Sequence, residues 1–295
     1  MTLVHHTGVS WPRSGHHLLV RLLKGYFGER FGYCEFHQGH PTPKGLGPCC
    51  KRVPCAHADR VALSKNHDFD LDVPQIPGHR YLVQYRDFTP SVVSNFELAV
   101  RAGLEDSAKA FRGFASQQFD HYEGFTRKWV HSDFMQGQLL LHYDALTGDP
   151  EATLARVVQA MAPGAPVDAA RIRDAVASAD GQSVANRQIT VQKGAGVRAM
   201  RRVEEFRHHD ARLFAQIARL KLRRDAVLAL FHDRLGRAPA ESNMLAFQGY
   251  DSLGALDAMI CATPEYRKRQ ASGGTKVAET ETRPKDRLTE GPQKS

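Results

Sequence analysis

The segment GVSWPRSGHHLL, residues 8–19, limits the folds open to this chain more than any other stretch. Residues 2–9 lead into it with a short, partly apolar run that suits a β-strand. Pro12 and Gly15 form a turn, and apolar residues then recur at the spacing of a helix with one buried face. These apolar residues are Leu19, Leu22, Leu23, Tyr26 and Phe27. A strand, a turn and a helix in that order present the unpaired amide groups of a helix N-terminus, so we expect an oxyanion to bind at this turn.

A second unit of the same kind follows. Residues 61–65 and 80–85 are predicted strands. The second strand leads into a helix in which Thr89 is the expected N-cap and Pro90 lies in the first turn.

A third unit is predicted from residue 138 onward. Residues 138–143 form a strand, and Asp149 and Pro150 supply the cap and the first residue of a helix. The buried face of that helix is Leu154, Val157, Val158 and Met161. Strands alternating with helices predict an α/β fold, a three-layer structure with a parallel sheet covered on both sides. Ligands of such sheets bind beyond the carboxyl ends of the strands, where segment 8–19 turns.

Two segments between these units have a different character. Residues 31–60 carry turn formers and no helical period, which indicates an irregular excursion from the core. Residues 105–130 carry aromatic residues at steps of about three and four, which predicts a helix with a buried aromatic face. The aromatic residues are Phe111, Phe114, Tyr122, Phe125 and Trp129.

The C-terminal part of the chain is predicted to be helical. The pattern is basic as far as Arg224, and a compact helical unit with turns at Gly236 and Gly249 follows. The last residues include almost no large apolar side chain, so we expect disorder there. The predicted divisions are a main domain over 1–222, a helical module over 223–268 and a disordered tail over 269–295.

The charge of the chain favours anionic partners. Lys and Arg number 40 against 32 Asp and Glu, a formal net charge of +8, and there are 15 histidines. Nucleotide phosphates, nucleic acid, an acidic glycan or a membrane surface fit this balance. No apolar run reaches the roughly 18 residues of a membrane span, and the N-terminus lacks an export-signal pattern. We therefore expect a cytoplasmic protein without a membrane span.

Four of the five cysteines crowd one segment, where two histidines accompany them. The six potential metal ligands are Cys34, His37, Cys49, Cys50, Cys55 and His57. The spacing C-x14-C-C-x4-C lacks the paired C-x2-4-C spacing of structural zinc sites. Free thiols are therefore favoured over one disulfide, and a disulfide over zinc.

The turn at residues 11–15 does not have the sequence of a nucleoside triphosphatase loop. Those loops have the form G-x-x-x-x-G-K-[ST], in which the Lys reaches the phosphates and the hydroxyl binds magnesium. No Lys-Ser or Lys-Thr pair follows Gly15, so a kinase or an ATPase is not expected. WPRSGHHLLVRLL instead resembles the 5′-phosphosulfate loop of the sulfotransferases, whose usual form is Tyr/Phe-Pro-Lys/Arg-Ser-Gly-Thr/Asn-Thr/His-Trp/Leu.

Further segments resemble the same family in the same order, so that the resemblance covers about residues 3–200. LSKNHDF is similar to the Lys-Thr-His segment that carries the catalytic base. YLVQYRDFTPSVVSNF is similar to the 3′-phosphate motif, an Arg at a strand end and a Ser eight residues later, here Arg86 and Ser94. TVQKGAGVR resembles the loop that closes over the nucleotide, and HYDALTGDPEATLARV resembles the Arg-Tyr-Glu-Asp-Leu stretch before a helix.

The resemblance implies transfer of a sulfuryl group from 3′-phosphoadenosine 5′-phosphosulfate (PAPS) to an acceptor hydroxyl or amine, of which a hydroxyl is favoured, with no metal required. His67 is implied as the base, because imidazole titrates near neutral pH, and Glu35 and His37 are the alternatives. Arg13 and Lys65 are implied as the cations that face the sulfuryl oxygens and the leaving phosphate. The implied donor-binding residues are Arg13, Ser14, Gly15, His16, His17, Arg86, Ser94, Lys193 and Gly194.

The chain departs from the family pattern at three places. His16 and His17 stand where cytosolic members have paired threonines. Leu18 stands where many members stack a Trp on adenine, and Gln192 where the closing loop often has Arg. These departures concern the tightness of nucleotide binding more than the reaction.

The acceptor and the wider class of protein stay open at this point. Residues 230–266 are similar to a small bacterial module of unknown function that often accompanies surface or glycan-related proteins, which favours a carbohydrate or glycolipid acceptor over a protein tyrosine or a small phenol. Basic stretches such as KLRRD leave a nucleic-acid-binding protein as the less favoured alternative, and we expect no nucleic-acid partner. The altered loop leaves a non-catalytic nucleotide sensor as another.

Overall fold

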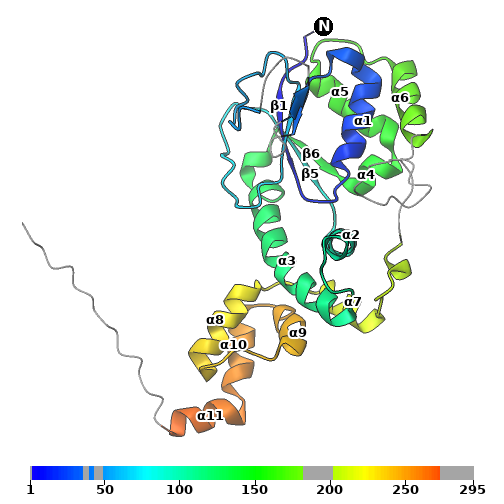
Figure 1. Ribbon diagram of the computed structural model, residues 1–295. Coiled ribbons are helices and arrows are strands. Elements are labelled where there is room, and N and C mark those ends of the chain that lie inside the picture. The colour runs from blue at the N-terminus through cyan, green and yellow to red at the C-terminus, as the bar shows by residue number, and fades with distance from the viewer. Residues whose placement is uncertain (1, 36–39, 43–48, 182–201, 273–295) are drawn as a thin grey trace, which may run out of the picture.

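The computed structural model describes residues 2–35, 40–42, 49–181 and 202–272 of the chain. Its centre is a six-stranded sheet in the order β3-β2-β4-β1-β5-β6 (Figure 1). The strands are β1 (His6–Ser10), β2 (Tyr33–Glu35), β3 (His40–Thr42), β4 (Leu63–Asn66), β5 (Tyr81–Tyr85) and β6 (Leu139–His142). Neighbouring strands pair in parallel except β2 and β3, which are antiparallel. The predicted α/β class with a parallel sheet is confirmed.

Helices follow most of the strands and continue beyond the sheet. The α-helices of the described residues are α1 (His16–Phe27), α2 (Phe88–Arg101), α3 (Ala108–Trp129), α4 (Tyr143–Gly148), α5 (Pro150–Met161), α6 (Ala169–Gly181), α7 (Ala211–Ile217), α8 (Arg224–Leu235), α9 (Met244–Gln248), α10 (Leu253–Cys261) and α11 (Pro264–Ala271). Short 3-10 helices span Gly28–Arg30, Asp133–Met135, Val203–Glu205 and Glu241–Asn243.

Both faces of the sheet are covered, as the alternation of side chains along β5 shows. Leu82 points to the face on which α1, α5 and α6 pack. Tyr81 and Val83 point to the opposite face and pack with Trp129 of α3. Figure 1 shows α1, α5 and α6 together on one side and α3 running away from the other.

The local patterns of α1, α3 and α5 are confirmed. The predicted apolar faces of α1 and α5 are buried, and the aromatic residues of α3 lie in the core or pack against it. The Asp149 carboxylate accepts a hydrogen bond from the Ala152 amide at 3.0 Å, so it caps α5 as expected.

Two sequence predictions are wrong. Residues 31–60 are not wholly irregular, because β2 pairs in parallel with β4 and extends the sheet. Thr89 is not the N-cap of α2, because the helix begins at Phe88 with Asp87 at the cap. Phe88 is buried against Phe119 and Tyr122 of α3, at ring separations of 5.3 Å and 5.1 Å, and this burial outweighs the preference for a capping hydroxyl.

The region predicted as a helical module contains α8 to α11, which lie on the side of α3 away from the sheet (Figure 1). They enclose an apolar cluster of their own: Val227, Phe231, Met244, Leu256 and Ile260. The module is tied to α3, because Ser116 donates a hydrogen bond to Gln248 at 2.7 Å and accepts one from Arg224 at 2.9 Å. The first residues of the predicted disordered tail, 269–271, belong instead to α11, and residues 273–295 lie outside the described residues.

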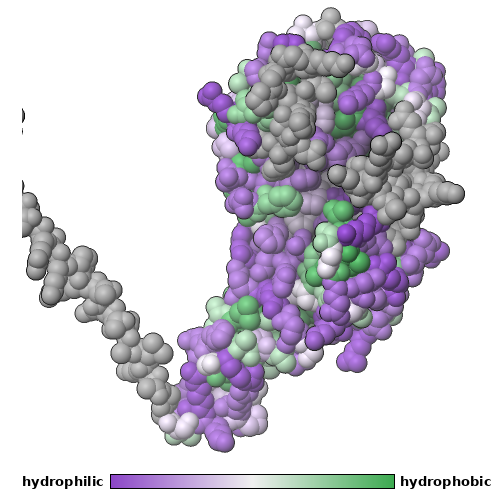
Figure 2. Space-filling model, in the orientation of Figure 1, coloured by the Kyte–Doolittle hydropathy of each residue, from purple (hydrophilic) through white to green (hydrophobic). Residues whose placement is uncertain are grey.

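The visible surface is mostly hydrophilic, with smaller hydrophobic areas over its middle and lower parts (Figure 2). In the described part of the chain, no helix combines the length and the apolar character that crossing a bilayer requires.

Candidate functional site

The turn between β1 and α1 has an unusual backbone, with two residues in the left-handed region. Arg13 and Gly15 have φ angles of 65° and 84°, in the left-handed region. A Cβ atom on Gly15 would lie 2.8 Å from Cδ2 of Tyr143, so both the conformation and the close approach require glycine. The amide groups of the first turn of α1 have no acceptors within the helix, so they are open to an anion.

Trp11 anchors this turn to the rest of the fold. Its indole Nε1 donates to Ser91 Oγ on α2 at 3.0 Å, and its ring packs edge-on against Tyr122 at 5.2 Å. Its amide donates to the Gln84 carbonyl of β5 at 2.8 Å. The turn is therefore held in place by contacts that involve neither Arg13 nor the start of α1.

Arg13 reaches across the site to the second predicted anion motif. Its Nε donates to Ser94 Oγ on α2 at 2.8 Å. Burial lowers the pKa of Arg13, and the nearby guanidinium groups of Arg101 and Arg86 lower it further. Arg13, Arg86 and Ser94, predicted from separate segments, thus border one site.

Arg86 lies directly after β5, over the ring of Tyr143, with its Cζ 4.1 Å from the ring centroid. Burial lowers its pKa, while Tyr143, Asp144 and Asp87 act in the opposite direction. Among the described residues, no carboxylate forms an ion pair with Arg13 or Arg86, and Arg86 Nε is buried without a hydrogen-bond partner. Two cations at the end of a parallel sheet that form no direct ion pair within the described part of the chain favour an anionic ligand.

Tyr143 is a site residue that the sequence analysis did not single out. It begins α4, and its ring contacts both the Arg86 guanidinium and the position of Gly15. The segment that contains it resembles a family stretch, and that was the only signal for it in the sequence. Its ring joins the turn after β1 to the end of β5.

Ser14 is 1% exposed, and its Oγ has no hydrogen-bond partner among the described residues. A buried hydroxyl without a partner costs free energy unless a ligand or water satisfies it. Its amide donates to the Trp11 carbonyl at 3.2 Å, which closes the turn. The position of Ser14 therefore suits a residue that binds an oxyanion.

The side chain of His16 lies in the interior and not in the anion site. Its Nδ1 is 3.0 Å from the side-chain amide of Gln84, and its Nε2 is 3.0 Å from the Tyr33 hydroxyl. Burial holds the pKa of His16 well below its usual value, so the ring is neutral. Of the residues expected to bind the donor, His16 can therefore contribute its backbone amide but not its imidazole.

A chain of hydrogen bonds runs from His16 through Tyr33 to Glu35, at the carboxyl end of β2. The Tyr33 hydroxyl donates to Glu35 Oε1 at 3.1 Å, so it accepts from the His16 Nε2–H. The atom of Gln84 that faces Nδ1 is Oε1, at 3.0 Å. Because a ring protonated on Nε2 has only an acceptor at Nδ1, exchanging the oxygen and nitrogen of this amide would make the contact a hydrogen bond and give the buried Gln84 nitrogen a partner. Neither Gln84 nor Tyr33 was predicted from the sequence, because these hydrogen bonds join three separate segments of the fold, α1, β2 and β5.

Lys65, Glu35 and His17 lie together at the carboxyl end of β4 and β2. Strand register pairs Lys65 with Gly8 on one side and Glu35 on the other. Burial lowers the pKa of Lys65, and the Glu35 carboxylate opposes that change. His17, largely exposed, has its Nδ1 3.7 Å from Glu35 Oε1. Strand register thus places the lysine beside the turn, with the Glu35 carboxylate near enough to favour its charged form.

His67 follows β4 directly, and its tautomer is set by the strand beside it. Its Nδ1–H donates to the Ser10 carbonyl at 2.6 Å. A proton fixed on Nδ1 makes Nε2 the basic nitrogen of the ring, which is the arrangement a general base needs. Its ring centroid lies 5.2 Å from that of Phe69, whose side chain is 53% exposed.

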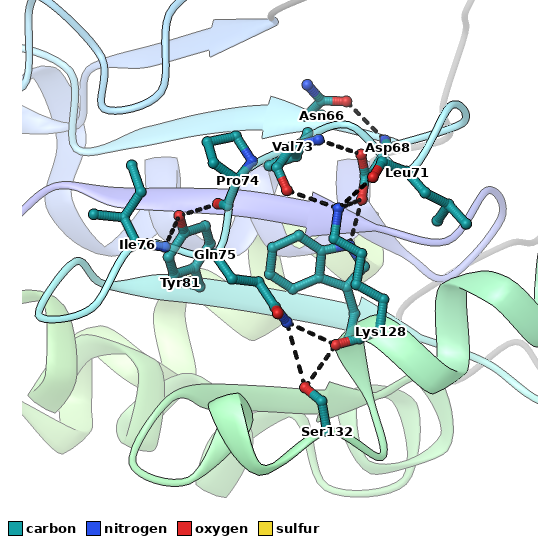
Figure 3. A network of polar contacts seen from close by, with 11 residues as sticks. Asn66, Asp68, Leu71, Val73, Pro74, Gln75, Ile76, Tyr81, Lys128 and Ser132 are labelled. Atoms are coloured by element: carbon teal, nitrogen blue, oxygen red, sulfur yellow. Dashed lines mark hydrogen bonds and ion pairs between the residues drawn. The ribbon is translucent and has the colours of Figure 1, made fainter.

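A buried ion pair holds the loop that carries His67 (Figure 3). Asp68 accepts hydrogen bonds from Lys128 Nζ at 2.8 Å, Trp129 Nε1 at 2.6 Å and the Val73 amide at 2.7 Å. Lys128 Nζ also donates to the carbonyls of Leu71 and Val73, at 2.8 Å and 2.7 Å. Every donor and acceptor of the pair is satisfied, so the loop is fixed against α3.

The remaining predicted residues fall outside the part of the chain that the structure describes. Lys193, Gly194 and the alternative base His37 are in residues 182–201 and 36–39. Asp87, His142 and Asp144 lie near Arg86 with potential ligand atoms within 4.8 Å of one another, but acidic groups this exposed commonly gather without an ion.

No family model matches this chain, and no curated protein matches it. Its function must therefore be inferred from the site and from the motifs that compose it.

Proposed function

We propose that the chain is a sulfotransferase with a P-loop-like core, which moves a sulfuryl group from PAPS to an acceptor hydroxyl. The observation that carries the proposal is the hydrogen bond between Arg13 and Ser94, 81 residues apart in the chain, beside Arg86. It joins the turn that resembles a 5′-phosphosulfate loop to the motif that resembles a 3′-phosphate site. A ligand with anionic groups at both ends of one nucleoside fits such a pair.

The donors left unsatisfied at the site match the needs of that ligand. Arg13, the buried Ser14 hydroxyl and the first amides of α1 would hold the 5′ end. Arg86 and Ser94 would hold the 3′-phosphate, which separates PAPS from ordinary adenosine nucleotides. Lys193 and Gly194 would complete the site from the segment that resembles the closing loop.

The chemistry needs positioning and charge stabilisation more than it needs covalent catalysis. PAPS supplies the activated sulfuryl group. The acceptor oxygen forms a bond to sulfur while the bond from sulfur to the 5′-phosphate oxygen breaks, and His67 Nε2 takes the acceptor proton. Arg13 and Lys65 stabilise the negative charge that grows on the leaving phosphate and the sulfuryl oxygens.

Among the described candidates, the geometry favours His67 over Glu35 as the base. Glu35 already accepts a hydrogen bond from Tyr33 and offsets the charge of Lys65. His67 is oriented by the Ser10 carbonyl and carried on a loop that the Asp68–Lys128 pair fixes. A fixed imidazole with a defined tautomer meets the needs of proton abstraction better than a carboxylate occupied elsewhere.

Phe69 supports an acceptor with a flat apolar face, and we propose a carbohydrate or glycolipid. Its ring lies beside His67 and is half exposed, on a loop whose Asp68 and Leu71 have left-handed backbones. Such a ring can stack on the C–H face of a sugar while a neighbouring hydroxyl reaches the base. A tyrosine or phenol acceptor is the alternative that the experiment below distinguishes.

The test is to incubate the protein with PAPS and three acceptor sets: oligosaccharides, tyrosine peptides and simple phenols. Mass spectrometry then follows the addition of one sulfuryl group. We expect a sulfated sugar whose formation needs His67. Transfer to a phenol alone would replace the proposed acceptor. If PAPS neither binds nor transfers to any set, the proposal fails.

A further inference from the structure

Four of the five cysteines form one cluster beside the sheet. Cys34 and Cys55 are buried with Val61, and Cys49 and Cys50 pack against them. The Sγ atoms of Cys50 and Cys55 are 3.8 Å apart, and the Cys34 thiol lies within hydrogen-bonding reach of Cys49. All four are free thiols. The fifth, Cys261, lies in α10 of the helical module.

Backbone amides are directed at two of these sulfur atoms. The Lys51 amide donates to Cys49 Sγ at 3.4 Å, and the Ala56 amide donates to Cys50 Sγ at 3.4 Å. Amides that face a sulfur atom in this way can keep their hydrogen bonds to it when the sulfur binds a metal. The segment is thus arranged around sulfur atoms that accept hydrogen bonds.

We propose that Cys34, Cys49, Cys50 and Cys55 bind one Zn²⁺ ion. Zinc held by four thiolates is tetrahedral with Zn–S distances of about 2.3 Å, which places neighbouring sulfurs about 3.8 Å apart. The Cys50–Cys55 separation already has this value. Zn²⁺ replaces the four thiol protons, which leaves a centre of charge −2, and Lys51 and Arg52, which follow Cys49 and Cys50 directly along the chain, can offset part of that charge.

The other sulfurs must close onto this pair when the ion binds. Within the described part of the chain, no three of the cysteine sulfurs lie within 4.8 Å of one another. Rotation of a cysteine side chain about one bond, χ1, relocates its sulfur, so binding requires no change of fold. A disulfide between Cys50 and Cys55 would use two thiols and leave the gathering of Cys34 and Cys49 unexplained.

The pairing of strands in the sheet brings Cys34 near the other three cysteines, which the spacing in the sequence does not predict. Cys34 is the central residue of β2 and pairs in register with Ser64 of β4, while Val61 leads into β4. The parallel pairing of these strands brings Cys34 to the segment of residues 49–55, although no short paired spacing connects them. Because Tyr33 and Glu35 flank Cys34, the ion would also fix the strand that carries them.

The experiment uses the full chain without an affinity tag, reduced and freed of metal. Titration with Co²⁺ is followed by absorption, and zinc is measured by mass spectrometry after reconstitution. We expect about one ion per chain, a sulfur-to-cobalt charge-transfer band and the intense d–d bands of a tetrahedral site. Cys50→Ser should weaken Co²⁺ binding by about tenfold or more, while the matched control Cys261→Ser binds as the unmodified chain does.

Two results would overturn the zinc site. One is the absence of a thiolate–cobalt band in the unmodified chain while all five thiols react with a thiol reagent. The other is a thiolate–cobalt band that is unchanged in Cys50→Ser, which would place the ion elsewhere. The titration of the unmodified chain decides the matter even if a variant fails to fold, and it does not depend on PAPS binding.

Discussion

Arg13 Nε donates a 2.8 Å hydrogen bond to Ser94 Oγ, and this bond ties the turn after β1 to the helix after β5. Arg13 reaches Ser94 from a left-handed backbone, with φ at 65°, on a turn that Trp11 anchors independently. The bond holds the guanidinium over the edge of the sheet, where Arg86 also lies. The two segments predicted to bind anions are therefore joined before any ligand binds.

Replacing Ser94 with Ala removes the acceptor that orients Arg13. A hydrogen bond to a charged group contributes about 1.5–3 kcal/mol, so affinity for 3′-phosphoadenosine 5′-phosphate should fall by about tenfold or more. Isothermal titration calorimetry measures the change. Ser272→Ala, at the far end of the helical module, should bind as the unmodified chain does. An unchanged affinity in Ser94→Ala would show that the bond has no part in nucleotide binding.

Replacing His67 with Asn should separate catalysis from binding. General-base catalysis typically contributes about 10²–10⁴-fold to the rate, so sulfuryl transfer should fall by that range while nucleotide affinity stays within about twofold. Steady-state kinetics with PAPS and the sugar acceptor gives the rate, and calorimetry gives the affinity. His121→Ala, exposed on α3, serves as the control. Full activity in His67→Asn would show that another group acts as the base.

Replacing Gly15 with Ala tests the close approach of Tyr143 to the turn. Gly15 and Gly164 have nearly equal positive φ angles, 84° and 82°, so Ala at either position costs about 1–2 kcal/mol of backbone strain. Nothing lies within 4 Å of a Cβ on Gly164, whereas one on Gly15 meets Tyr143 at 2.8 Å. Gly15→Ala should therefore lower the thermal midpoint more than Gly164→Ala, and it alone should weaken nucleotide binding. Equal effects of the two variants on both measurements would argue against the clash.

The free energy of unfolding should decrease as the pH is lowered, because some histidines are buried in their neutral form. Burial lowers the pKa of His6 to about 4, against the raising effect of its hydrogen bond to the Val4 carbonyl. Between pH 6.5 and 4 the unfolded chain binds the proton more readily than the folded chain does. The contribution of His6 is thus complete above pH 6.5 and is lost as pH falls toward 4, by up to about 3 kcal/mol.

Urea unfolding at pH 7.5, 5.5 and 4.5 measures this loss. His6→Gln should reduce the fall in unfolding free energy between the first and last pH, because glutamine does not titrate. His121→Ala should leave the fall unchanged. If His6→Gln and the unmodified chain lose the same free energy, His6 is not the group that titrates.

The sequence predicted the strand–turn–helix units well, because their patterns are local. The buried faces of α1 and α5 follow directly from helical spacing, and Asp149 caps α5 through a contact three residues away. Strand β2 was not predicted, since its three residues show no alternation and become a strand only by pairing with β4. Similarly, burial of Phe88 against α3 moves the start of α2, and no local signal shows that contact.

Parts of the site depend on contacts between distant segments, which one sequence does not reveal. Successive residues of a helix point about 100° apart, yet nothing in the pair His16-His17 indicates which imidazole faces the interior. The structure buries His16 and leaves His17 exposed. The Asp68–Lys128 pair likewise joins residues 60 apart in the chain and could not be inferred from either segment alone.

The central claim is that Arg86 recognises a 3′-phosphate on a nucleotide whose other end lies at Arg13. The most direct measurement is calorimetric titration with 3′-phosphoadenosine 5′-phosphate and with AMP, for the unmodified chain, for Arg86→Ala and for Arg173→Ala, an exposed control on α6. We predict that the unmodified chain and Arg173→Ala bind the bisphosphate about 10–100-fold more tightly than AMP, and that Arg86→Ala loses this preference. Equal affinity of the unmodified chain for the two nucleotides, or a preference that survives in Arg86→Ala, would contradict the claim.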